Sequence, residues 1–215
     1  MTMPTQHIFL LRHLKTEANK NNLIMGRVID PPVLEQYIPA FQAYLRVLKK
    51  EFPALGDAVF YSSPALRCQQ TIQIAMAEFS QQSKTHNIDR RLQETDLGGF
   101  SGLTTKQIRE QYPELLDRWM KHPEEIRFPD GESYDDVQKR AWEWFESVLV
   151  LQQKAIVAVT HVDIIKMILF RNLGIPIANK RLVVIDTGSA TIFAKRGSEV
   201  VLMGANLSSR YSESF

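Results

Sequence analysis

The sequence predicts an α/β protein of three layers, in which helices cover both faces of a mostly parallel central sheet and a small helical lid is inserted. Three observations predict this class. The short apolar runs His7–Leu11 and Ala155–Thr160 are typical of buried strands. Segments with helical spacing of apolar residues alternate with strand-like segments almost from end to end. A stretch rich in Gly and Pro, approximately residues 98–131, interrupts this alternation.

The first half of the chain alternates strand, loop and helix. After the first strand, Thr16–Pro32 is polar and rich in Asn, which predicts a long loop over the sheet edge. Leu34–Phe52 carries apolar residues at helical spacing. Asp57–Tyr61 predicts a short strand, and Ser62–Pro64 a capped start for the next helix, which carries Arg67 in its first turn.

The second half begins with the inserted lid, Gly98–Gly131, in which glycines and prolines separate short helical pieces. Glu132–Leu151 predicts a long amphipathic helix that leads into the strand Ala155–Thr160. Val162–Asn172 predicts another helix, closed by Gly174. The last strands are expected at Arg181–Asp186, Ala190–Lys195 and Val200–Met203.

Composition and charge narrow the class of protein. The 215 residues carry 26 basic and 24 acidic side chains, and the basic ones are scattered, so nucleic-acid binding is not expected. No apolar run approaches the roughly 20 residues that span a bilayer, and the N-terminus does not resemble a signal peptide. The single cysteine, Cys68, fits a reducing compartment. We expect one cytoplasmic domain over residues 1–215 with no nucleic-acid or membrane partner; a homodimer stays an open option.

Charged and imidazole side chains follow the predicted strands at the points where the strands end. Arg12 and His13 follow the first strand, and Arg67 follows the second. His161 follows a third strand, and Glu94 stands before the lid. Because the carboxyl ends of parallel strands meet at one edge of a sheet, we expect these side chains to lie together. Phosphoryl transfer to histidine requires a neutral imidazole, cations for the phosphate oxygens and an acid for the leaving alkoxide, and these residues supply all three.

Five segments then resemble one family, the histidine phosphatase superfamily in its phosphoglycerate mutase-like branch. The segment Leu-Arg-His-Leu-Lys-Thr at Leu11–Thr16 is similar to its Leu-x-Arg-His-Gly-x-Thr signature. The other segments agree in order and spacing: Tyr61–Arg67 with Thr71, Glu94–Gly98 with Gly102, Asp130–Ser133, and Val159–His161. The resemblance covers nearly the whole chain. It implies a phosphorylated small-molecule substrate, a phosphohistidine intermediate, and neither a metal nor another cofactor.

The resemblance also implies roles for individual residues around the phosphate. It makes His13 the nucleophile that becomes phosphohistidine. The phosphate pocket would be formed by Arg12, Arg67 and His161, with His161 donating a hydrogen bond to the transferred group. Asn19, six residues after His13, matches a polar position that contacts phosphate in the family.

Two further roles concern the leaving group and the loop. Glu94 would act as general acid toward the leaving oxygen and then as general base toward water. Asp96 lies two residues away and is the alternative acid. Thr16 is expected to hold the loop after the first strand and to lie beside the substrate.

Three positions depart from the family pattern. Leu14 and Val162 stand where glycine usually follows each pocket histidine, and we expect them to narrow the pocket, shape it for an apolar leaving group or impair turnover. Leu97 stands where the mutases have tyrosine, and the lid lacks the Arg-Arg pair expected of a mutase. We therefore predict hydrolysis rather than phosphate transfer.

The predicted function is hydrolysis of a small-molecule phosphomonoester. One alternative is a phosphoglycerate-type phosphomutase. A second is a protein phosphohistidine or phosphoserine phosphatase, which the lid disfavours because those relatives have little lid. The third is a catalytically weak, phosphate-binding regulatory module, in which Leu14 and Val162 have spoiled the pocket.

Overall fold

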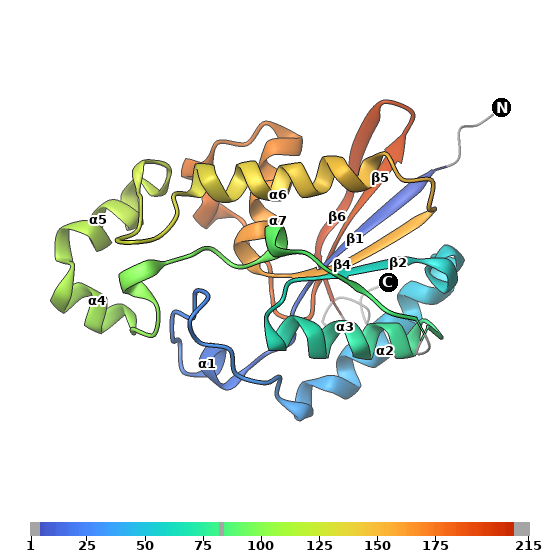
Figure 1. The fold of residues 1–215 in the computed structure, drawn as a ribbon, viewed down its shortest axis with the longest axis horizontal. Coiled ribbons are helices and arrows are strands. Elements are labelled where there is room, and N and C mark those ends of the chain that lie inside the picture. Colours follow the sequence, from blue (N-terminus) through green and yellow to red (C-terminus); the bar gives the residue numbers. More distant parts are fainter. Residues whose placement is uncertain (1–4, 82–83, 209–215) are drawn as a thin grey trace.

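A six-stranded mixed sheet forms the centre of the computed structural model, which describes residues 5–81 and 84–208 (Figure 1). The strands lie in the order β3-β2-β4-β1-β5-β6. The first four are mutually parallel, whereas β5 is antiparallel to β1 and to β6. Their bounds are β1 Gln6–Arg12, β2 Val59–Ser62, β3 Asn87–Ile88, β4 Ala155–Thr160, β5 Ala190–Arg196 and β6 Glu199–Leu207. The predicted α/β class with a mostly parallel sheet is confirmed.

The pairing of β1 with β4 brings the two histidine-bearing strands together. Both strands are apolar and buried on both faces, as expected for central parallel strands. Their register aligns Leu11 with Val159 and Arg12 with Thr160. His13 and His161 therefore each follow the last residue of adjacent strands, at the same edge of the sheet.

Helices cover both faces of the sheet (Figure 1). On one face, α2 (Ile38–Glu51) and α3 (Leu66–Glu78) pack their apolar sides against β1, β2 and β4. On the other face, α6 (Tyr134–Leu149) and α7 (Val162–Leu173) enclose a second core, which contains the buried Trp144. α7 ends at Gly174, which adopts the left-handed conformation predicted for it.

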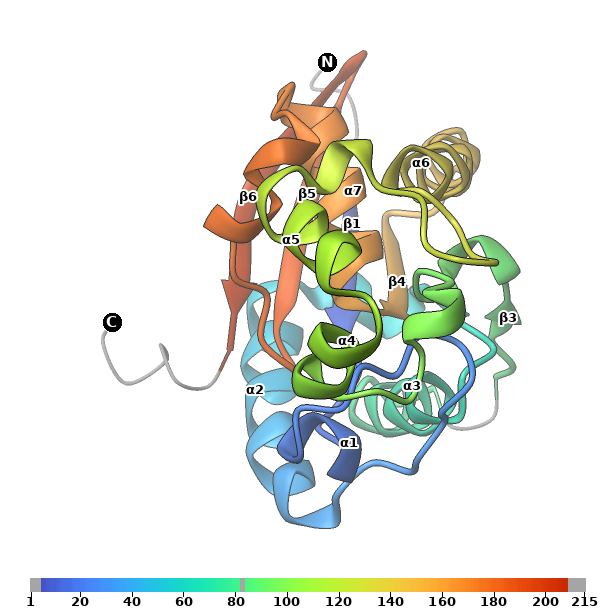
Figure 2. The same cartoon turned by 90° about the vertical axis from the view of Figure 1, so that its left-hand side faces the viewer.

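The segment between residues 98 and 131 holds α4 (Thr105–Gln111) and α5 (Pro113–Lys121), which lie in front of the carboxyl ends of β1 and β4 (Figure 2). Its two ends meet where the Gly99 amide donates to the Pro129 carbonyl, 2.9 Å away. Gly98 has a φ of +46°, and backbone of Pro129 fills the place of a side chain there, so only glycine fits. The two ends of this segment, which we call the lid, are thus hydrogen-bonded to each other.

Four local expectations were wrong or incomplete. The predicted strand Arg181–Asp186 is absent: a 3₁₀ helix covers Ile177–Leu182, and residues 183–186 form no strand. The reason is that the Ile185 carbonyl accepts from the Arg12 side chain (2.6 Å), while β5 takes the place beside β1. The short strand β3 had no apolar signal and was missed.

The start of α3 also differs from the prediction. Ala65, rather than a serine, is the N-cap, so the helix begins two residues after Pro64. The Leu66 amide donates to the Asp30 carboxylate at 2.6 Å, which means that a distant loop supplies the cap. The expected Thr16–Pro32 loop contains one short helix, α1 (Glu17–Lys20). No helix within the described ranges combines the length and apolar character needed to cross a bilayer.

Candidate active site

His13 and His161 lie side by side at the carboxyl edge of the sheet. The His13 amide donates to the Thr160 carbonyl at 3.0 Å, which ties the two strand ends together. The ring centroids are 5.3 Å apart and the rings meet edge to face. Both side chains are buried. The two histidines that the sequence separates therefore share one site, as predicted.

The His13 ring has a defined tautomer. Its Nδ1 lies 2.7 Å from the Leu14 carbonyl oxygen, which can only accept, so Nδ1 carries the proton and Nε2 keeps its lone pair. Burial, and then the positive charges of Arg12 and Arg67, hold the pKa of His13 well below its usual 6.5. The ring is therefore neutral near pH 7, and its Nε2 carries no proton.

Two guanidinium groups face this imidazole, and each keeps one buried N–H without a partner. Arg12 donates through Nη1 to the Ile185 carbonyl, and Arg67 donates to Asp30 at 3.0 Å. In both arginines Nε is buried and unpaired. An unpaired buried donor is costly, and a phosphate oxygen is the kind of acceptor that satisfies it.

His161 is held by neighbours on α3 and the residues before it. Arg67 Nη2 donates to its Nδ1 at 3.2 Å, so the proton lies on Nε2, which donates to Ser63 Oγ at 2.9 Å. Burial, and then the charge of Arg67, hold the pKa of His161 well below 6.5. Cys68 Sγ lies 3.5 Å from Nε2, and burial raises the pKa of its thiol, as fits a passive side chain. The contact of Ser63 with His161 was not foreseen.

Glu94 lines a small cavity of about 110 Å³ together with Arg67 and His161. Burial, and then the nearby Asp163 carboxylate, raise the pKa of Glu94 to about 7. Burial alone would raise the pKa of Asp163 too, but Lys180, 2.7 Å away, holds it below its usual value. The two carboxyl groups therefore differ in protonation, and Glu94 is the one that can exchange a proton near neutral pH.

Comparison with known proteins agrees with this geometry. The family model described as histidine phosphatase superfamily (branch 1) matches residues 8–207. The chain belongs to the histidine phosphatase superfamily. This confirms the resemblance found in the sequence.

Relatives within the superfamily include both phosphatases and mutases. Phosphoserine phosphatase 1 of Hydrogenobacter thermophilus is 26% identical over 208 residues, covering 96% of this chain and 94% of the relative. A 2,3-bisphosphoglycerate-dependent phosphoglycerate mutase of Beijerinckia indica is 25% identical, covering 90% of this chain and 94% of the mutase. The solved structure of Bacillus stearothermophilus YhfR shares the fold with a TM-score of 0.82, at 24% identity and with 95% and 98% of the two chains covered.

The superfamily's loop positions Thr16 and Asn19 bind each other. Thr16 caps α1, and its amide and hydroxyl both donate to the Asn19 side-chain oxygen, at 3.1 and 3.0 Å. Thr16 therefore holds the loop, as the resemblance implies. The Asn19 oxygen is engaged there, so its amide nitrogen is the group left to contact phosphate; that contact stays a prediction.

Leu14 and Val162, which replace superfamily glycines, have different surroundings. Leu14 is buried in the core beneath α2, and the described residues with positive φ do not include it. A leucine is therefore accommodated there without left-handed strain, and its side chain lies in the core rather than in the small cavity around Glu94. Val162 is the first residue of α7 and lines a second, larger cavity, so it is the substitution that narrows space beside the site.

A clamp that the sequence did not reveal holds the backbone of Glu94. The Glu94 carbonyl accepts from Arg27 Nε at 2.9 Å and from Arg140 Nη2 at 3.1 Å. Glu132 binds both guanidinium groups, at 2.7 Å for Arg27 and 2.9 Å for Arg140. Its second oxygen accepts from the Asp96 amide at 3.0 Å. Glu132 lies in the matched segment Asp130–Ser133, which was the only sequence signal for this clamp.

Replacing Glu132 with Gln tests the clamp. We expect the free energy of unfolding to fall by about 1–3 kcal/mol, because two largely buried arginines lose their carboxylate. Burial alone would raise the pKa of Glu132, but the hydrogen bonds and charge of Arg140 lower it below 4.5. The stabilisation is therefore fully present above pH 4.5 and is lost as the pH falls through the lowered pKa. Urea unfolding at several pH values measures this.

Glu17→Gln is the matched control, since Glu17 pairs with Lys20 across an exposed surface. Equal losses in the two variants, or a Glu132 effect that persists unchanged in acid, would contradict the clamp.

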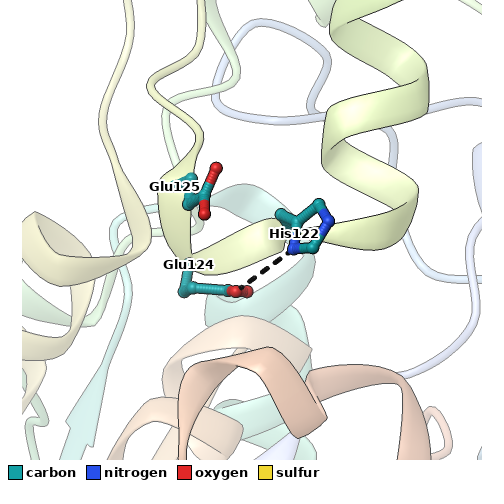
Figure 3. Close-up of side chains that lie close together, drawn as sticks. All are labelled: His122, Glu124 and Glu125. Atoms are coloured by element: carbon teal, nitrogen blue, oxygen red, sulfur yellow. Dashed lines mark ion pairs between the residues drawn. The ribbon is translucent and has the colours of Figure 1, made fainter.

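One grouping among the described residues has side chains close enough to share a metal: His122, Glu124 and Glu125 (Figure 3). It lies at the carboxyl end of α5 and in the residues that follow it. His122 Nδ1 is 3.6 Å from Glu124, and Glu125 pairs with Arg118 at 3.9 Å. These exposed ion pairs account for the grouping, and nothing built around it points to an ion.

Proposed function

We propose that the chain is a metal-independent phosphatase that hydrolyses a small-molecule phosphomonoester through phosphohistidine at His13. The observation that supports this most strongly is the His13 ring itself. Its Nδ1 is committed to the Leu14 carbonyl, Nε2 is unprotonated, and Arg12 and Arg67 each hold a free buried N–H beside it. A neutral nucleophile between two cations suits attack on a phosphate dianion.

The first step forms the phosphoenzyme. Nε2 of His13 attacks phosphorus, a nitrogen–phosphorus bond forms, and the bond between phosphorus and the ester oxygen breaks. Glu94, protonated near neutral pH because its pKa is about 7, gives its proton to the leaving oxygen. Arg12 and Arg67 bind the phosphate oxygens, and the substrate alcohol leaves neutral.

The second step releases phosphate. Glu94, now a carboxylate, takes a proton from water, and the water oxygen bonds to phosphorus as the nitrogen–phosphorus bond breaks. His13 returns to its neutral tautomer, and Glu94 is again protonated. The Leu14 carbonyl holds the His13 Nδ1 proton throughout, which stabilises the ring while Nε2 is phosphorylated.

Hydrolysis is favoured over phosphate transfer by the surroundings of the acid. Leu97, at the position of the mutase tyrosine, is buried in the core and offers no hydroxyl to the site. The relative from Hydrogenobacter named phosphoserine phosphatase 1 matches nearly the full chain, which supports the same reaction class. A mutase would instead return phosphate to an acceptor faster than to water.

Hydrolysis of p-nitrophenyl phosphate in EDTA, followed from acid to alkaline pH, tests the proposal. We expect turnover that resists EDTA and a bell-shaped kcat/KM profile. Activity falls above about pH 7 as Glu94 loses its proton, and it falls on the acid side, well below pH 6.5, as His13 gains one. Loss of activity in EDTA, or an alkaline limb unrelated to Glu94, would contradict the mechanism.

A further inference from the structure

A cavity of about 520 Å³ is lined by Arg12 at one part of its wall. Its wall is formed by α7, the lid and the segment 180–186, which spans the end of the 3₁₀ helix and the residues after it. Arg12 donates to the Ile185 carbonyl in that wall, so the guanidinium lies at the junction between the cavity and the histidines. A phosphate bound by Arg12 therefore has this cavity beside it for the rest of its molecule.

One face of α7 leads from the histidines into the cavity. Val162 and Lys166 are four residues apart on this helix, so they lie on the same face, and both line the cavity. His161 directly precedes this helix. Lys166 is thus one helical turn further from the phosphate site than Val162.

The cavity wall holds more positive than negative charge. Lys180 is neutralised by Asp163 at 2.7 Å and also donates to the Tyr134 hydroxyl. Lys166 Nζ donates to the Lys180 carbonyl at 3.0 Å, which satisfies one of its three protons and none of its charge. Burial, and then the positive charge of Lys180, lower the pKa of Lys166 to about 8. Lys166 therefore lies partly buried, beside a second lysine.

A second cation and an aromatic ring complete the wall. The Arg181 guanidinium lies 5.7 Å from the centre of the Trp119 ring and donates to the Trp119 carbonyl at 3.4 Å. This joins α5 of the lid to the segment 180–186. Asp186 also lines the cavity and accepts from Asn206 at 3.2 Å.

We propose that this cavity binds the leaving group of the substrate and that Lys166, with Arg181, binds a second anionic group on it, either a carboxylate or a second phosphate. The inference rests on the proposed phosphatase function, whose substrate class it narrows. Val162 and Trp119 supply the apolar walls between the two anionic ends. Monophosphates of uncharged alcohols leave the cations unpaired and are poorer substrates.

The test uses matched esters. A series of ω-carboxyalkyl phosphates of increasing chain length is compared with the alkyl phosphates of the same length, and an alkanediol bisphosphate with its monophosphate. We expect kcat/KM to favour the anionic member by at least about tenfold at the best length. In Lys166→Met this preference falls by about tenfold, and Lys166→Arg restores much of it. Lys139→Met, on the exposed side of α6, keeps the preference.

The outcomes separate the two proposals. Equal kcat/KM for matched esters at every chain length, in a protein that hydrolyses p-nitrophenyl phosphate, overturns the second anion site and leaves the phosphatase function standing. A preference that survives in Lys166→Met overturns it as well. If no ester is hydrolysed, the phosphatase proposal fails. The second anion site is then tested by calorimetry on the same pairs of esters: tighter binding of the anionic member supports the site, and equal dissociation constants overturn it. The set of esters that shows the preference, carboxyalkyl phosphates or bisphosphates, identifies the second anionic group as a carboxylate or a phosphate.

Discussion

His13→Ala is expected to lower kcat for p-nitrophenyl phosphate by at least about a thousandfold, because it removes the atom that forms the phosphoenzyme. The effect is this large because no other described group near the site offers an unprotonated nitrogen: the His161 Nδ1 accepts from Arg67 and its Nε2 carries the proton. Stopped-flow or steady-state release of p-nitrophenol measures the loss. Phosphohistidine hydrolyses in acid. The phosphoenzyme is therefore trapped and digested at alkaline pH before the phosphorylated residue is mapped.

Two controls define the meaning of that result. Inorganic phosphate should still bind His13→Ala, because Arg12 and Arg67 remain, and calorimetry measures this. His122→Ala changes a histidine on the exposed lid surface and should keep its activity. Residual activity within tenfold of the parent in His13→Ala, or phosphate found on another residue, would refute the assignment of the nucleophile.

Glu94→Gln is expected to lower kcat by about a hundred- to ten-thousandfold for an alkyl phosphate, since no acid then protonates the leaving alkoxide. The loss should be smaller for p-nitrophenyl phosphate, because p-nitrophenolate leaves readily without a proton. The alkaline limb of the pH profile should also disappear, since the pKa near 7 belongs to Glu94. Rates for both esters across pH measure all three effects.

Asp96→Asn is the matched comparison, because Asp96 was the alternative acid. In the structure its carboxylate accepts from the Gly98 amide at 3.1 Å and lies 3.6 Å from Arg27, so it is engaged in the loop. We expect a much smaller loss than for Glu94→Gln and an unchanged dependence on the leaving group. A larger loss of kcat in Asp96→Asn than in Glu94→Gln would instead assign the general acid to Asp96.

Central strands and their end residues were predictable from the sequence. Ala155–Thr160 was predicted with the bounds that the structure gives β4, and β1 differs by one residue at each end. Strands buried on both faces must be continuously apolar, and so they stand out in a polar chain. The positions of His13 and His161 followed from this, because each residue directly follows its strand.

Segments whose conformation depends on distant partners were not predictable. Residues 181–186 contain the apolar run Leu182–Ile185, which resembles a strand, yet the Ile185 carbonyl binds Arg12 instead of a neighbouring strand. Likewise, the cap of α3 comes from Asp30, 36 residues before Leu66. Local periodicity carries no information about such contacts.

The sequence by itself determined the α/β class, the superfamily and which side chains gather at the carboxyl edge of the sheet. These follow from local apolar patterning and from residue identity at strand ends. Only the tertiary structure decided the state of those side chains: the free Nε2 of His13, the raised pKa of Glu94 and the clamp of Glu132. Protonation and orientation depend on burial and on charges that distant segments bring within a few ångströms, and these exist once the chain has folded.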